Sequence, residues 1–303
     1  MPIVRSIAIV SAAGLAVLLL AGGAPAQTSQ QFAQCAGEGD TTPVSRIAAC
    51  GALIASNALD PTNLAAAYDN RGDAYAAEHH LDRAIADYEQ ATKLNPDDAT
   101  AFDNCGLAYA GRGQYDRAIA SYGRSIALRP NDAAIFDNRG LAYAGEGQYD
   151  RAIADYDQAI KLAPGAAIFY DRGNAYAGEH QYDHAIADYD AALKLDPNSA
   201  AVLNNRGLAY AGKAQYGRAI ADYDAAVKLA PDAAFTFNNR GLAQAAQAQY
   251  SPAIADYDQA IKLDPNYAAA YYNRGLVRQQ NGDDAGGAAD IAKAKQIDPA
   301  IGR

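Results

Sequence analysis

The sequence predicts an all-α solenoid of seven helix–turn–helix repeats preceded by a small cap. A glycine recurs every 34 residues, and once after 33, at Gly72, Gly106, Gly140, Gly173, Gly207, Gly241 and Gly275. A proline keeps the same period, at Pro96, Pro130, Pro164, Pro197, Pro231, Pro265 and Pro299. A fixed period of this length is typical of solenoids, in which each repeat buries its apolar face against its neighbours.

Residues 133–165 show how one repeat forms two helices. Phe136, Gly140 and Tyr143 lie on one face at the spacing of an amphipathic helix. Gly147 then interrupts the pattern, and a second periodic run follows until Pro164 prevents its continuation. Each repeat is therefore predicted to be helix, turn, helix, turn.

These positions resemble the tetratricopeptide repeat, whose signature has an aromatic residue, Gly, Tyr, Ala, a second aromatic, Ala and Pro at fixed offsets. The third repeat has these types at Phe136, Gly140, Tyr143, Ala152, Tyr156, Ala159 and Pro164. The resemblance implies a right-handed superhelix with repeats at residues 65–98, 99–132, 133–165, 166–199, 200–233, 234–267 and 268–301. The family's leading Trp is Tyr, Phe or Leu here. The last repeat departs most, at Gln279, Gly287 and Ile291, as a capping repeat would.

Residues 1–26 are predicted to be a secretory signal peptide. A positive start ends at Arg5, an apolar run follows to Leu20, and small residues precede Gln27. A retained N-terminal anchor is the alternative, although the apolar run is short for a span of about 20 residues. The expected location is exported, periplasmic or secreted, with no membrane span after cleavage.

The segment between the signal and the repeats, residues 27–64, is predicted to be an N-terminal cap. In an oxidising compartment its two cysteines, Cys35 and Cys50, are expected to form a disulfide. Two buried free thiols are the alternative. Within this cap, residues 45–61 are expected to form a lone second helix of a decayed repeat.

The net charge is −10. This balance argues against nucleic acid and anionic membrane surfaces as partners, since both attract basic patches. It favours a basic or neutral protein partner.

Six of the seven repeats have an arginine before the glycine, where the tetratricopeptide family usually has an aliphatic residue. They are Arg71, Arg139, Arg172, Arg206, Arg240 and Arg274. The same six repeats have an aspartate sixteen residues later, at Asp87, Asp155, Asp188, Asp222, Asp256 and Asp290. The second repeat lacks both and has Cys105 and Ser121. This joint change predicts a structural ion pair, within a repeat or across adjacent repeats.

The residue before that arginine points away from the packed face on a helical wheel. It is Asn70, Asn104, Asn138, Asp171, Asn205, Asn239 or Asn273. These residues are predicted to line a concave groove and to bind the backbone of an extended peptide, because an amide both donates and accepts hydrogen bonds. The pattern resembles asparagine ladders in tetratricopeptide superhelices that hold extended peptides. The alternative is that the amides face water or satisfy local backbone groups.

Neighbouring groove positions differ between the two halves of the chain. Asp69, Asp73, Asp103 and Asp137 make the first half acidic, whereas Tyr170 and Tyr272 belong to a neutral second half. The floor of the groove is predicted to carry Leu107, Leu141, Leu208, Leu242 and Leu276. These residues are also predicted to contact the peptide. A partner with a basic end and small apolar side chains would fit this gradient.

Nothing in the repeat resembles reaction chemistry, so no catalytic residue, cofactor or metal is predicted. His180 and His184 have the spacing of two metal ligands on a helix, but His180 falls where other repeats have a turn glycine. A metal site and an enzyme are the alternatives. The preferred function is a non-enzymatic scaffold that binds a protein segment and helps to assemble an envelope complex. The alternative from another class is a self-associating structural protein.

Overall fold

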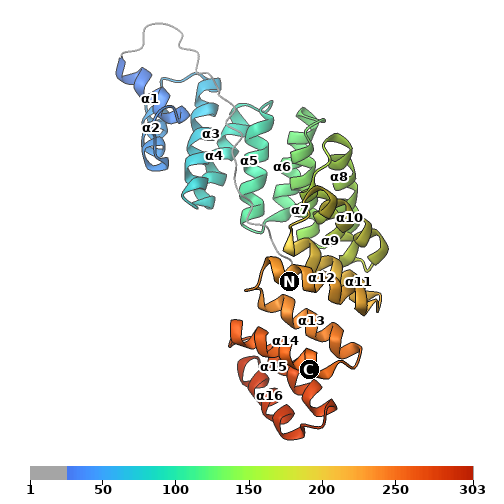
Figure 1. Cartoon of the computed structure of the whole chain (residues 1–303). Helices are drawn as coiled ribbons and strands as arrows, with labels where there is room; N and C mark the ends of the chain where they lie inside the picture. Colours follow the sequence, from blue (N-terminus) through green and yellow to red (C-terminus); the bar gives the residue numbers. More distant parts are fainter. Residues whose placement is uncertain (1–25, 303) are drawn as a thin grey trace. The chain divides into compact units, whose positions relative to one another are not determined.

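A computed structural model describes residues 26–302, which form helices joined by short turns (Figure 1). This range contains 16 helices and no strand, so the predicted all-helical fold is confirmed. The helices are α1 (Ala26–Ala36), α2 (Pro43–Ala55), α3 (Pro61–Ala77), α4 (Leu81–Leu94), α5 (Ala99–Gly111), α6 (Tyr115–Leu128), α7 (Ala133–Gly145), α8 (Tyr149–Leu162), α9 (Ala166–Gly178), α10 (Tyr182–Leu195), α11 (Ala200–Gly212), α12 (Tyr216–Leu229), α13 (Ala234–Ala246), α14 (Tyr250–Leu263), α15 (Ala268–Gln280) and α16 (Asp284–Ile297). The predicted signal peptide lies outside the described residues, apart from Ala26 at the start of α1.

The chain divides into two compact units, residues 1–163 and 164–303, which we call unit one and unit two. The described part of unit one contains α1–α8, and that of unit two contains α9–α16. From α3 onward the helices pack in consecutive pairs, and each pair is one repeat with a first and a second helix. None of the helices between residues 26 and 302 has the length and apolar character needed to span a bilayer.

The turns inside the repeats all use left-handed backbone. Gly113 has φ 69° and Gly147 has φ 74°, a conformation that glycine adopts without strain. The equivalent residues of other repeats include His180, at φ 59°. The second helices end before proline: Ala163 and Asp196 are extended because the residue before a proline disfavours helical backbone.

The repeat glycine allows the two helices of a pair to approach closely. In the first six repeats a tyrosine from the second helix lies over it, and Tyr88, Tyr156 and Tyr257 are fully buried in this way. A Cβ atom on Gly72 would lie 2.6 Å from Cε1 of Tyr88, which is shorter than any normal contact. The fixed period of glycine therefore follows from helix packing.

The N-terminal cap consists of two helices, α1 and α2. They are joined by the Cys35–Cys50 disulfide, with an S–S distance of 2.05 Å. Both cysteines are buried with Leu53 and with Ala67 of α3, so the cap packs on the first repeat. The expectation of a lone helix at residues 45–61 is wrong, because α1 completes the pair and α2 ends at Ala55. Residues 26–36 lack the repeat pattern, which is why sequence reasoning missed α1.

Candidate functional site

The first helices of neighbouring repeats lie against one another within each unit. In unit one α3 contacts α5 and α5 contacts α7; in unit two the contacts run from α9 through α11 and α13 to α15. Within either unit, the described second helices of neighbouring repeats make no such contacts. The first helices therefore form the inner layer of each unit.

We define the inner wall by three positions of each first helix. They are the two residues before the conserved arginine position and the residue after the repeat glycine. In α11 these residues are Asn204, Asn205 and Leu208.

The ladder asparagines donate hydrogen bonds to the preceding repeat. In unit two, Nδ2 of Asn239 lies 3.1 Å from Oδ1 of Asn204, and Nδ2 of Asn273 lies 2.9 Å from Oδ1 of Asn238. In unit one, Nδ2 of Asn138 lies 3.4 Å from Oδ1 of Asp103. Each of these bonds joins two inner-wall residues of neighbouring repeats.

The ladder therefore holds the repeats together as well as lining their inner wall. Asn104 and Asp171 are buried, so they offer little to a partner. Asn138, Asn239 and Asn273 are only half-buried, and their side-chain oxygens accept no hydrogen bond from residues 26–302. These three oxygens can accept hydrogen bonds from the backbone of a bound segment. Asn70, in the first repeat, is half-buried as well.

The residue after the repeat glycine divides the inner wall into polar and apolar sections. Asn174 is polar there: its Oδ1 accepts from Tyr189 and from Asn205, at 2.8 Å each. Asn205 also donates to the hydroxyl of the buried Tyr170, at 3.0 Å. In the last three repeats the position is leucine. Leu208, Leu242 and Leu276 are 45%, 45% and 38% exposed.

Three inner-wall carboxylates of unit one have raised pKa values. Burial, and then the charge of Asp73, raises the pKa of Asp69 well above its usual range. Burial also raises the pKa of Asp73, and it raises that of Asp103 to about 6. Asp137 of α7 and Tyr272 of α15 are half-buried at the matching positions of their repeats.

The structure brings together all six predicted arginine–aspartate pairs. Each arginine donates from Nε and Nη2 to both carboxylate oxygens of the aspartate in its own repeat, at 2.6–2.8 Å. Such two-point contacts are among the strongest side-chain hydrogen bonds. The bonds to Asp155 raise the pKa of Arg139, which keeps its charge.

Sequence reasoning missed a second carboxylate on three of these arginines. Nη1 of Arg206, Arg240 and Arg274 lies 2.6–2.7 Å from the preceding repeat, at Asp190, Asp224 and Asp258 respectively. These arginines therefore bridge two repeats. The recurring Asp-Tyr-Asp triplet on the second helix could have predicted this contact. Its first aspartate binds the arginine of its own repeat, and its second aspartate binds the arginine of the next repeat.

The second repeat replaces this network by different contacts. Its free Cys105 is buried, and burial raises the pKa of the thiol to about 12. Because Cys105 takes the place of the arginine, Glu89 of the preceding repeat accepts a hydrogen bond from Tyr109 instead. Arg124 lies over the ring of Phe102, 5.6 Å from its centroid.

The histidines lie in and beside the turns. Nδ1 of His180 lies 2.8 Å from the hydroxyl of Tyr182, and Nδ1 of His184 lies 3.1 Å from Oε1 of Gln181. His79 and His80 are exposed. Within residues 26–302, no three His, Cys, Asp or Glu side chains are grouped so as to hold a metal ion.

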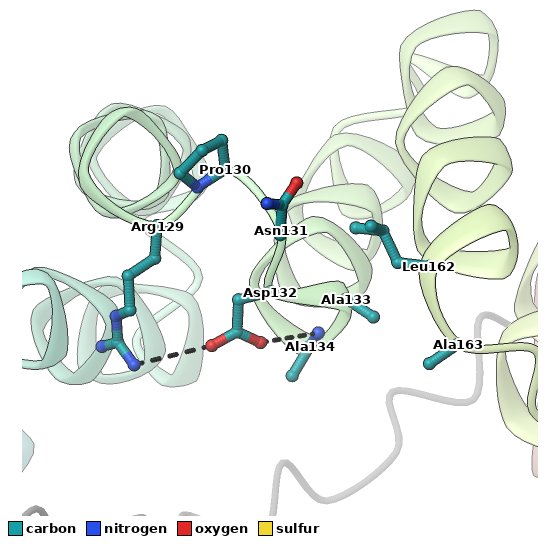
Figure 2. A pocket seen from close by; sticks show the side chains of 8 residues that line it. All are labelled: Arg129, Pro130, Asn131, Asp132, Ala133, Ala134, Leu162 and Ala163. Carbon is teal, nitrogen blue, oxygen red and sulfur yellow. Dashed lines mark hydrogen bonds and ion pairs between the residues drawn. The ribbon is translucent and has the colours of Figure 1, made fainter.

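A shallow pocket of about 590 Å³ lies between the α6–α7 turn and the end of α8 in unit one (Figure 2). Pro130, Leu162 and neighbouring alanines give it apolar walls. Its two charged side chains are engaged with the protein: Arg129 and Asp132 form an ion pair at 3.5 Å, and Asp132 caps α7 through the backbone NH of Ala134. The pocket therefore offers no free titratable pair for catalysis.

Repeated helix pairs with an inner layer of first helices define a helical-repeat scaffold. Three family models match the chain: a TPR repeat at residues 72–113, 106–146, 173–213 and 246–282, and tetratricopeptide repeats at 138–165 and at 200–233. The chain belongs to the tetratricopeptide repeat family. Members of this family generally mediate protein–protein interactions and are generally non-enzymatic. None of the curated proteins compared with the chain matches it.

Solved structures share the fold. YrrB, described as a TPR protein with an unusual peptide-binding site, is 22% identical with a TM-score of 0.52, over 60% of this chain and 95% of its own. A tetratricopeptide repeat protein from Parabacteroides merdae is 18% identical with a TM-score of 0.63, over 77% and 93%. In the APC/C hetero-tetramer Cut9–Hcn1, the match is 16% identical with a TM-score of 0.60, over 90% and 52%. This chain thus spans about half of that last one. At these identities the similarity concerns the fold.

Proposed function

We propose that the protein is a non-enzymatic scaffold whose inner wall binds an extended segment of another polypeptide, and that it serves in the assembly of an envelope complex. The observation that carries this proposal is the row of exposed leucines on α11, α13 and α15. Leu208, Leu242 and Leu276 occupy the same position in three successive repeats whose first helices contact one another. A row of exposed apolar side chains on a preformed surface is typical of interaction sites.

Polar groups beside this row suit an extended backbone. The free side-chain oxygens of Asn239 and Asn273 lie one helical turn from the leucines of the same helix, Leu242 and Leu276. Binding would combine hydrogen bonds to the partner's backbone with burial of its small apolar side chains.

Export from the cytoplasm is the second part of the proposal. The signal-like features of residues 1–26 support it, and so does the Cys35–Cys50 disulfide, because disulfides persist in oxidising compartments. We do not propose self-association. The exposed residues of α16 include Ala288, Ala292, Lys293 and Gln296, which are small or polar.

The test compares two leucine variants. Replacing Leu208, Leu242 and Leu276 together by glutamine removes the apolar row from the inner wall. The control replaces Leu195 and Leu229, which are just as exposed but end the second helices α10 and α12. Tagged proteins would be recovered from the exported fraction, and the polypeptides that accompany them quantified by mass spectrometry.

We expect the wild type and the control to retain the same partner and the inner-wall variant to lose it. If the partner is recovered equally with all three proteins, the inner wall is not its binding site.

A further inference from the structure

Three carboxylates on the inner wall of unit one leave acceptor atoms unused. Asp69 and Asp73 lie one turn apart on α3, and Nδ2 of Asn104 on α5 lies 3.5 and 3.1 Å from their Oδ1 atoms. Asp103, beside Asn104, accepts from Asn138 through Oδ1 at 3.4 Å. The Oδ2 atoms of all three aspartates accept no hydrogen bond from residues 26–302. These free oxygens come from two neighbouring first helices.

The charged groups around these aspartates leave an excess of negative charge. From the cap, Arg46 of α2 approaches Asp69 and Asp73, and Asp98 lies near Asp69. Arg129 and Asp132 lie near Asp103 and pair with each other. Burial raises the pKa of Asp69, Asp73 and Asp103, which disfavours their ionised forms. A positive charge bound nearby would stabilise the ionised form of each carboxylate.

A buried tyrosine hydroxyl of the second repeat also lacks a hydrogen-bond partner within the described part of the chain. In the first repeat the core tyrosine reaches the inner wall, where the hydroxyl of Tyr88 donates to Oδ1 of Asp73 at 2.9 Å. In the second repeat the position of Asp73 is taken by Leu107. Tyr122 is 0% exposed, and within residues 26–302 its hydroxyl has no hydrogen-bond partner. Burial and then the charge of Asp103 raise the pKa of Tyr122.

We propose that the inner wall of unit one binds a lysine or arginine side chain of a partner polypeptide, held between Asp69 and Asp73 on α3 and Asp103 on α5. The proposal rests on the function above and adds the chemistry of the bound segment. An ammonium or guanidinium group has several donors, which match the separate free oxygens. A bare divalent ion fits less well, because these aspartates do not form a metal-binding group.

The experiment titrates the full-length protein with short labelled peptides of alternating lysine and alanine. Glutamine–alanine and glutamate–alanine peptides of equal length separate charge from backbone binding. The test variant is Asp69→Asn with Asp103→Asn, which keeps an Oδ1 acceptor for Asn104 and Asn138. The control, Asp150→Asn with Asp232→Asn, removes two charges from exposed side chains that make no hydrogen bond within residues 26–302.

We expect the lysine peptide to bind the wild type and the control alike, and to bind the test variant at least about tenfold more weakly. Lowering the pH through about 6 should weaken binding to the wild type, because Asp103 loses its charge on gaining a proton. The test variant should show a flatter pH profile.

Two results would overturn the proposal. If the wild type binds the lysine and glutamine peptides equally well, the cation site is wrong while the scaffold function stands. If calcium ions bind stoichiometrically, are lost in the test variant, and the lysine peptide does not bind, the site belongs to an inorganic cation. Loss of the leucine-dependent partner tests the scaffold function separately, since those leucines lie in unit two.

Discussion

At the scale of single residues, the repeated arginine illustrates how a buried charge is tolerated. Arg139 lies on the packed face of α7, and Asp155 satisfies it through two hydrogen bonds of 2.7 Å. Arg139 and Arg151 both lie over the ring of Tyr143, with guanidinium carbons 5.8 and 5.7 Å from its centroid. Each ring–cation contact contributes about 0.5–1 kcal/mol at partly exposed sites. Removing either charge alone should therefore be costly, whereas removing both should not.

The pair in the third repeat gives the first prediction. Asp155→Ser leaves Arg139 without a carboxylate, and we expect a loss of about 3 kcal/mol in the opening free energy of α7–α8. Adding Arg139→Cys recreates the Cys–Ser combination of the second repeat and should restore most of that loss. Hydrogen exchange of amides in these helices is the appropriate measurement, because a repeat array opens locally.

The fifth repeat provides a comparison for that prediction. Asp222→Ser should cost less than Asp155→Ser, because Arg206 keeps Asp190 at 2.6 Å. Equal losses at the two sites would show that the second carboxylate adds nothing. A double variant as unstable as Asp155→Ser alone would contradict the paired-charge account.

The sequence could predict these pairs because repeats serve as controls for one another. Cys105 and Ser121 change together, and this joint change identified the partners sixteen residues apart. The ladder bonds could not be predicted in the same way. Asn239 meets Asn204 only because stacking places neighbouring repeats in register, and no change of one residue accompanies a change of the other. Only the structure shows that the ladder asparagines both line the inner wall and join neighbouring repeats.

At the scale of helices, the contacts between repeats differ along the chain. In unit two, three successive arginines bind a carboxylate of the preceding repeat. In unit one, glycine occupies the position that would hold this carboxylate: Gly51 lies near Arg71, and Gly123 lies near Arg139. A Cβ atom on either glycine would lie 3.8 Å from Nη1 of that arginine. These two junctions therefore lack the bridging ion pair of unit two.

Gly123→Asp should supply the missing carboxylate and protect the α6–α7 junction. The added Cβ would meet no atom closer than 3.8 Å, so the side chain fits. We expect a gain of about 0.5–1 kcal/mol from a half-exposed ion pair. Replacing a helical glycine also stabilises, so Gly123→Asn is the matched control. Hydrogen exchange of α6 and α7 should be slower in the aspartate variant than in the asparagine variant. Identical exchange in both would mean that no ion pair forms.

The helices themselves were largely predictable, and the exception is informative. Periodic apolar residues and the turn glycines placed both helices of each repeat. The helix α1 was missed because residues 26–36 carry no repeat pattern, and its pairing with α2 depends on Cys35 and Cys50. A non-glycine turn residue such as His180 adopts left-handed backbone because the flanking helices require it.

At the scale of the whole molecule, each unit presents its own kind of inner wall. Unit one has carboxylates with raised pKa values, and unit two has a row of exposed leucines. The sequence predicted the acidic residues of unit one, but it placed leucines along the groove floor of both units, including Leu107 and Leu141. The sequence could not predict how many of the ladder amides are occupied by hydrogen bonds within the protein. Because many are occupied, we expect a partner to contact the exposed leucines more than the ladder.

The central claim is that a partner polypeptide binds the inner wall. The most direct test places a photo-crosslinking amino acid at Leu242 on α13, with Lys262 on the second helix α14 as the exposed control position. After irradiation of cells that express each protein, we predict a crosslinked second polypeptide from position 242 and none from position 262. Crosslinks from position 262 alone, or equal yields from both positions, would contradict the claim.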